Sequence, residues 1–113
     1  MLLIALGQCP RPAFAPKRRA LADLLEGGDE SALQPWQRSA FEAARVAPSA
    51  VNMQPWRFAF DARSVSVLEK STLLTKKYAP YDRGIAMLNL TVGAAKEHRD
   101  GRWQACENGY QFK

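Results

Sequence analysis

Residues that build metal sites and disulfide frameworks are scarce in this sequence. Its 113 residues include two cysteines, Cys9 and Cys106, and a single histidine, His98. Two isolated cysteines make no disulfide framework, and this usage is typical of a reducing compartment. No CxxC pair and no nucleophile motif accompany His98. We therefore predict no metal ligands and no catalytic Ser-His-Asp or Cys-His arrangement.

Long apolar stretches are missing as well. The apolar run at residues 2–6, LLIAL, is far shorter than the roughly 20 residues that span a bilayer. It also lacks the basic region and the length of a signal peptide. We expect a cytoplasmic protein with no membrane partner, in which residues 2–6 form a buried strand that ends at Gly7 and Pro10.

Acidic residues are fewer than basic ones, and the formal net charge is +5. Such a balance favours anionic partners, among them phosphates, nucleotides and nucleic acids. The lysines and arginines are scattered, however, and are not interleaved with aromatic residues, and no nucleic-acid recognition motif is present. We therefore predict no nucleic-acid partner.

The first half of the chain carries two helix signals. In residues 18–28, RRALADLLEGG, the leucines fall on one face and two glycines end the pattern. A second helix is expected to begin at Pro35 and to end at Ala47, because Pro48 disfavours helical geometry in the residue before it. Trp36 and the alanines at positions 40, 43, 44 and 47 form one stripe, and Gln37 is expected to face water.

Strand signals follow, and then one long helix. Residues 56–60, WRFAF, alternate in hydrophobicity, residues 64–70 read as a partner strand, and residues 103–112 read as a hairpin around Asn108-Gly109. Residues 82–98 read as the longest helix, with Asp82 as its N-cap. Because this helix is apolar nearly all round, we expect it to be buried on more than one face.

The segment from residue 47 to 60, APSAVNMQPWRFAF, joins the second helix to the first of these strands. Its order, Pro-Ser-x-x-Asn-x-Gln-Pro-Trp, resembles that of the FMN-dependent nitroreductases. A second match is DRGIAMLNLTVGAA at residues 82–95, which is similar to the central helix of that family, and Gly101 and Trp103 fit a Gly-x-Trp that tends to follow. The resemblance covers residues 35–113 well, and residues 1–34 fit a variant subgroup.

The resemblance implies an α+β fold in which a short antiparallel sheet packs against a long central helix. It also implies FMN as cofactor, with Pro48, Ser49, Asn52 and Gln54 as cofactor-binding residues. An asparagine amide both donates and accepts, which suits the pyrimidine edge of a flavin. In such a protein NADH or NADPH supplies a hydride, the flavin passes electrons to a nitro compound or a quinone, and no side chain acts as a catalytic residue.

Two departures from the family pattern shape this interpretation. The Arg-Arg-Ser-x-Arg segment that grips the FMN phosphate is absent, and only Lys17, Arg18 and Arg19 offer a basic replacement. The chain is also about half the usual length. We therefore expect residues 1–113 to be one domain, equivalent to the C-terminal half of a two-part nitroreductase, which pairs with a second copy or with the missing N-terminal half.

Each residue also has a simpler explanation. Pro48 and Ser49 fit a helix stop and a turn, Asn52 fits a left-handed turn residue, and residues 17–19 fit a solvated basic turn. The corresponding alternative function is a degenerate half that binds a partner and performs no chemistry.

Overall fold

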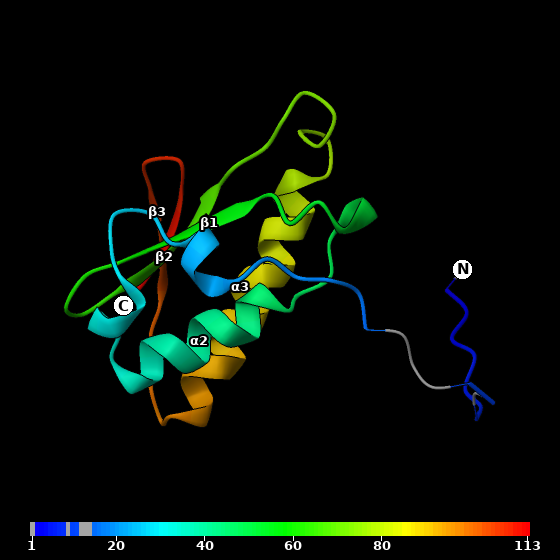
Figure 1. Cartoon of the computed structure of the whole chain (residues 1–113), viewed down its shortest axis with the longest axis horizontal. Coiled ribbons are helices and arrows are strands. Elements are labelled where there is room, and N and C mark those ends of the chain that lie inside the picture. Colours follow the sequence, from blue (N-terminus) through cyan, green and yellow to red (C-terminus); the bar gives the residue numbers. More distant parts are fainter. Residues whose placement is uncertain (1, 9, 12–14) are drawn as a thin grey trace.

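The body of the structure is a four-stranded antiparallel sheet with helices packed against it (Figure 1). This computed structural model describes residues 2–8, 10–11 and 15–113. In chain order the elements are α1 (Leu21–Leu24), η1 (Glu30–Ala32), α2 (Pro35–Arg45), η2 (Ala50–Asn52), β1 (Trp56–Phe60), β2 (Val65–Glu69), α3 (Ala79–Lys96), β3 (Trp103–Cys106) and β4 (Gly109–Phe112). The predicted α+β class is confirmed.

The sheet has the strand order β1-β2-β4-β3, and every neighbouring pair is antiparallel. The alternation predicted for residues 56–60 holds, because Trp56 and Phe58 are fully buried on one side of the sheet. Phe58 pairs with Val67 across the ladder and stacks on Phe41 of α2, with 4.8 Å between the ring centroids. The hairpin β3–β4 joins the same sheet through β2.

Helix α2 begins at Pro35, as predicted, and its buried stripe includes Ala40, Phe41 and Ala44. The prediction that Gln37 faces water is wrong, since this residue is 1% exposed. Its amide group donates to the carbonyls of Asp61 and Ser64 and accepts from the Gln34 N–H. Burial of the polar side chain is thus offset by hydrogen bonds that tie α2 to the β1–β2 turn.

Helix α3 begins at Ala79, three residues before the expected start, with Tyr78 at the N-cap position. The assignment of Asp82 as the N-cap is therefore wrong. Proline is tolerated in the first helical turn, where its missing N–H has no partner to lose, so Pro80 lies inside the helix and not in the preceding loop. Asp82 instead bonds to a loop of the chain, as described below.

One side of α3 packs closely against α2. A Cβ on Gly93 would lie 2.5 Å from the Ser39 carbonyl oxygen and 2.8 Å from the Ala40 Cα, so only glycine permits this approach. Trp103 of the hairpin donates its indole N–H to the Thr91 hydroxyl, 3.1 Å away. Helix α3 also meets β2 of the sheet, so it is buried toward α2 and toward the sheet. In the part of the chain that the structure describes, the face with Leu88 and Val92 stays exposed, so the helix is not buried nearly all round.

The apolar residues 2–6 do not form the predicted strand. They have no regular secondary structure, and Leu2, Leu3, Ile4 and Leu6 are each at least 78% exposed. This end of the chain lies apart from the sheet in Figure 1. A strand needs a neighbouring strand to pair its backbone N–H and C=O groups, and no sheet edge lies beside this segment.

The α2–α3 contact predicts opposite effects for one substitution at two positions of α3. Gly93→Ala should destabilise the fold by about 1–3 kcal/mol, because the new methyl group overlaps the α2 backbone. Gly84→Ala, where a Cβ meets nothing within 4 Å, should stabilise the chain by about 0.5–1 kcal/mol, since alanine is the better helix former. Urea unfolding measures both. Equal effects would contradict the close contact.

Candidate functional site

The loop between α2 and β1 is held by its own backbone and by one hydroxyl group. Asn52 N–H donates to the Ser49 carbonyl, and Met53 N–H donates to the Ala50 carbonyl. The Ser49 hydroxyl oxygen accepts the Gln54 N–H at 2.9 Å. These bonds fold residues 49–54 into a tight turn, so that the chain leaves α2 and enters β1 over a short distance.

Three residues of this loop have left-handed backbone conformations. The φ angles are 47° at Val51, 54° at Asn52 and 51° at Gln54. Asparagine tolerates this region, but a β-branched residue there is an outlier. Val51 is 87% exposed, so no packing of its side chain explains the strain. Strained residues of this kind cluster at ligand sites and switch regions, which makes the loop a candidate site.

The side chains of Asn52 and Gln54 bind a distant segment of the chain, residues 17–19. Arg18 donates to Asn52 Oδ1 at 3.0 Å, and Asn52 Nδ2 donates to the Lys17 carbonyl at 2.8 Å. The Arg19 N–H donates to Gln54 Oε1 at 2.9 Å. We call this set of three bonds the clasp. It places three consecutive basic residues against the loop.

The N-terminal part of α3 holds the loop through a hydrogen bond. Asp82, which is 5% exposed, accepts the Ala50 N–H on its Oδ1 atom at 3.0 Å. Among the described residues its other oxygen, Oδ2, has no hydrogen-bond partner although it is buried. The central helix and the loop are therefore joined directly through one carboxylate.

Basic side chains gather behind the clasp. Arg45 donates to the Arg19 carbonyl at 3.2 Å and pairs with Glu42 at 2.8 Å. Partial burial lowers the pKa of the Arg57 guanidinium, and repulsion from Arg19 lowers it further. Attraction to Glu26 and Asp23 acts in the opposite direction on the pKa of Arg57. Among the described residues, the basic side chains of segment 17–19 form no salt bridge. Basic groups of this kind suit an anionic group such as a phosphate.

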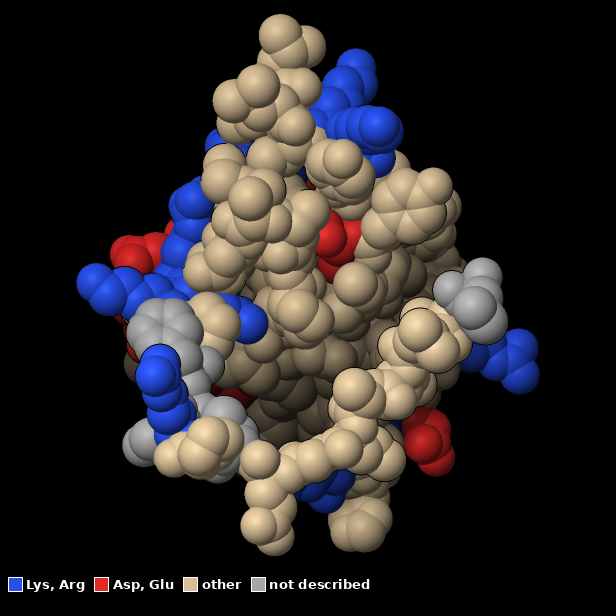
Figure 2. Space-filling model, turned by 90° about the vertical axis from the view of Figure 1, so that its right-hand side faces the viewer, with Lys and Arg blue, Asp and Glu red and all other residues tan. Residues whose placement is uncertain are grey.

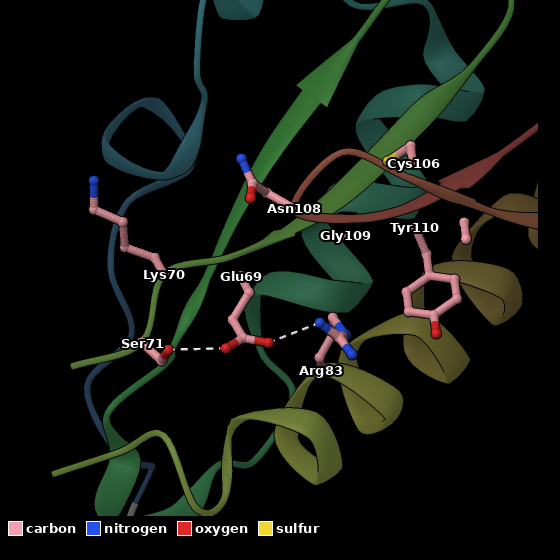
Figure 3. A pocket seen from close by; sticks show the side chains of 9 residues that line it. Glu69, Lys70, Ser71, Arg83, Cys106, Asn108, Gly109 and Tyr110 are labelled. Atoms are coloured by element: carbon pink, nitrogen blue, oxygen red, sulfur yellow. Dashed lines mark hydrogen bonds and ion pairs between the residues drawn. The ribbon is translucent and has the colours of Figure 1, made fainter. Parts of the chain in front are cut away.

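A separate polar cleft of about 580 Å³ lies between the end of β2, helix α3 and the β3–β4 turn (Figure 3). Arg83 reaches into it from α3, where it pairs with Glu69 at 2.7 Å and lies over the Tyr110 ring at 4.9 Å. Ser71 donates to the second oxygen of Glu69. None of the predicted site residues lines this cleft.

One long face of α3 is apolar and exposed. Four residues spaced by three or four positions lie on it, and their exposed fractions range from 39% to 74%: Tyr81, Ile85, Leu88 and Val92. We call these four residues the α3 stripe. Figure 2, seen from the side that carries η2, shows a face on which uncharged residues predominate, with acidic atoms near its middle and basic residues mostly toward its margins. Exposed apolar residues that line one face of a helix, as the α3 stripe does, mark an interaction site.

Three of the four predicted site residues come together in the structure. Ser49, Asn52 and Gln54 are joined by hydrogen bonds, whereas Pro48 lies exposed at the start of the loop. Sequence reasoning missed Asp82 as the support of the loop, because it assigned that residue to a helix cap. The basic triplet at residues 17–19 marked Arg18 as a candidate phosphate-binding residue. Its bond to Asn52 could not be predicted, because the two residues are 34 positions apart in the sequence.

Within the described part of the chain, no cluster of three or more histidine, cysteine, aspartate or glutamate side chains could hold a metal ion. No helix there is long and apolar enough to cross a membrane.

The arrangement of helices and strands is that of a nitroreductase-like protein. A crystal structure of a "putative nitroreductase" from Thermotoga maritima MSB8 superposes with a TM-score of 0.75 at 25% sequence identity. The family model described as "Putative TM nitroreductase" matches residues 1–94, and the chain belongs to that family. The superposition covers 91% of this chain and 44% of the Thermotoga chain, so the chain spans less than half of that relative. No curated protein matches it.

The strain in the loop predicts that glycine stabilises one position of it. Val51→Gly should raise the free energy of unfolding by roughly 1 kcal/mol, because glycine adopts a left-handed conformation without steric cost. Val46→Gly is the matched control, since Val46 is also exposed but has a φ of −87°. It should leave the stability unchanged or lower it. Equal effects of the two changes, measured by thermal unfolding, would contradict the strain.

Proposed function

We propose that this chain is one half of an FMN-dependent oxidoreductase, which passes electrons from NADH or NADPH to a nitro compound or a quinone. The observation that carries the proposal is the loop of residues 49–54, where strained backbone, the Asn52 and Gln54 amides and a basic segment meet at one place. Family membership supports the same chemistry. A cytoplasmic location is part of the proposal.

The residues around the loop fit the parts of FMN. The basic residues of segment 17–19 match the charge of a phosphate. Ser49, Asn52 and Gln54 carry hydroxyl and amide groups of both hydrogen-bonding senses, which a flavin ring edge requires. In this proposal FMN exchanges for some of the partners that these groups now have within the chain. The buried Oδ2 atom of Asp82 adds an acceptor.

Each part of the chain has a separate task in this proposal. The clasp positions Lys17, Arg18 and Arg19 next to the loop, and Asp82 fixes the loop relative to α3. The exposed Val51 and Met53 flank the site with apolar groups that exclude water. When bound, FMN supplies the hydride and electron transfer, and the protein binds, orients and shields it. No side chain of this chain is assigned a catalytic role.

The α3 stripe supports an incomplete site. We propose that a second copy of the chain, or the missing half of a longer protein, covers the stripe and completes the flavin pocket. The coverage of 44% of the Thermotoga chain is consistent with either arrangement. The alternative function, a non-catalytic half that serves as a dimerisation module, uses the same stripe. It is favoured by the clasp, which already occupies the side-chain atoms of Asn52.

A visible absorbance spectrum of the purified protein separates the two functions. The oxidoreductase should carry flavin or take it up from added FMN, and should then oxidise NADH or NADPH in the presence of a nitroaromatic compound or a quinone. A protein that is colourless after incubation with excess FMN and removal of the unbound cofactor, under conditions where it is associated, would exclude the oxidoreductase and leave the dimerisation module.

The proposed flavin contact predicts a loss of affinity in Asn52→Ala. The change should cost about 1–3 kcal/mol of FMN binding, because a buried ring edge loses its partners. Gln104→Ala serves as the control, since it removes an exposed side-chain amide from β3, outside the loop. A loss in Asn52→Ala with wild-type affinity in Gln104→Ala, by fluorescence titration, indicates that the Asn52 amide contributes to the site. Wild-type affinity in Asn52→Ala would refute the assignment.

The α3 stripe predicts self-association. Light scattering at several protein concentrations should show a mass that rises above that of the monomer, with or without FMN. Leu88→Lys should abolish the rise by placing a charge in the stripe, whereas Leu73→Lys, at a 93% exposed position outside α3, should not. A wild-type monomer that retains tightly bound FMN would contradict both the association and the need for a partner.

A further inference from the structure

The carboxylate of Asp82 has one oxygen that the chain does not use. Its Oδ1 atom accepts the Ala50 N–H, while Oδ2 is buried and has no partner among the described residues. The whole residue is only 5% exposed, so water does not solvate this oxygen freely. Buried polar atoms are nearly always hydrogen-bonded, and an exception calls for a physical explanation.

Among the described residues, no cation forms a salt bridge with Asp82 that would compensate for the unused oxygen. The neighbouring residue Arg83 turns to Glu69 in the polar cleft, with 2.7 Å between the charged atoms (Figure 3). Arg18, the basic residue of the clasp, is engaged by Asn52 and by backbone carbonyls. Within the described residues, Asp82 takes part in no salt bridge, and no acidic cluster of metal-binding type includes it.

The position of this oxygen connects it to the candidate site. Asp82 Oδ1 binds the first residue of η2, and the two residues that follow, Val51 and Asn52, hold the strained left-handed conformations. An ionised carboxylate accepts hydrogen bonds and donates none. The atom that would satisfy Oδ2 is therefore a donor, and the other oxygen of the same carboxylate already holds the loop of the candidate site.

We propose that Asp82 is a ligand-contacting residue whose Oδ2 atom accepts a hydrogen bond from a neutral N–H or O–H group of the bound flavin. The inference rests on the proposed function, since it assigns the residue to the same loop site. Two groups of FMN have this chemistry, the imide N–H of the ring and the hydroxyls of the ribityl chain. Asp82 then has two tasks, because Oδ1 holds the loop and Oδ2 binds the ligand.

The substitution Asp82→Asn separates these two tasks. An asparagine can keep an oxygen toward the Ala50 N–H and so preserve the loop, but it places an NH₂ group where Oδ2 was. A donor would then face the donor of the ligand. We expect FMN affinity to fall about ten-fold or more, which is the size of one hydrogen bond to a charged group. Resistance to urea should change little, because one unpaired buried polar group replaces another.

The control is Asp100→Asn, which removes the same charge at an exposed position after α3. FMN binding to the full chain is measured by fluorescence titration, at a protein concentration where light scattering shows association. Weakened binding in Asp82→Asn with wild-type binding in Asp100→Asn supports the inference. Wild-type binding in Asp82→Asn overturns the inference alone. Absence of FMN binding in the wild-type chain overturns the proposed function and the inference with it.

Flavin analogues identify the donor and keep the test independent of the variant's folding. FMN methylated at the imide nitrogen lacks the N–H group, and lumiflavin lacks the ribityl hydroxyls and the phosphate. Riboflavin serves as the reference for lumiflavin. Removal of the group that bonds to Asp82 should lower the affinity of the flavin for the wild-type chain. The same removal should lower its affinity for Asp82→Asn much less. If Asp82→Asn does not fold, equal wild-type affinity for each analogue and its reference overturns the inference.

Discussion

At Gly93, helix α3 approaches α2 so closely that a Cβ would lie 2.5 Å from the Ser39 carbonyl oxygen. Interiors are packed densely enough that one extra methyl group at such a point displaces a whole element. The same helix carries Asp82 near its other end, where the carboxylate meets the backbone of the loop after α2. The close packing of α2 and α3 therefore fixes the position of the Asp82 carboxylate relative to the loop.

Strain and polar contact balance each other in that loop. Residues 51, 52 and 54 adopt left-handed conformations that cost free energy, and the bonds from Asp82, Ser49 and segment 17–19 hold them there. Such a loop keeps its conformation only while Asp82, Ser49 and segment 17–19 hold it, so a ligand that exchanges for one of these partners would change the conformation of the loop. This property suits a binding site better than a simple connection, for which a relaxed turn would suffice.

Two sets of large apolar side chains lie in contact with water, the α3 stripe and residues 2–6. The core between α2, α3 and the sheet, by contrast, consists of buried side chains. Exposed apolar surface of this extent marks an interaction site, and the proposed second half or second copy of the chain is the partner that we assign to the α3 stripe.

Local patterns in the sequence determined the class and most of the elements. Alternation placed Trp56 and Phe58 in the core, Pro35 marked the start of α2, and the Pro-Ser-x-x-Asn-x-Gln-Pro-Trp order led to the nitroreductase family. Tertiary contacts decided the rest. The clasp joins residues 34 positions apart, Asp82 serves the loop instead of its own helix, Gln37 is buried by carbonyls of the β1–β2 turn, and residues 2–6 form no strand. Each of these features depends on a residue far away in the sequence that satisfies a polar group or pairs with a strand in the fold. The spacing of residues along the chain does not predict which distant residues meet.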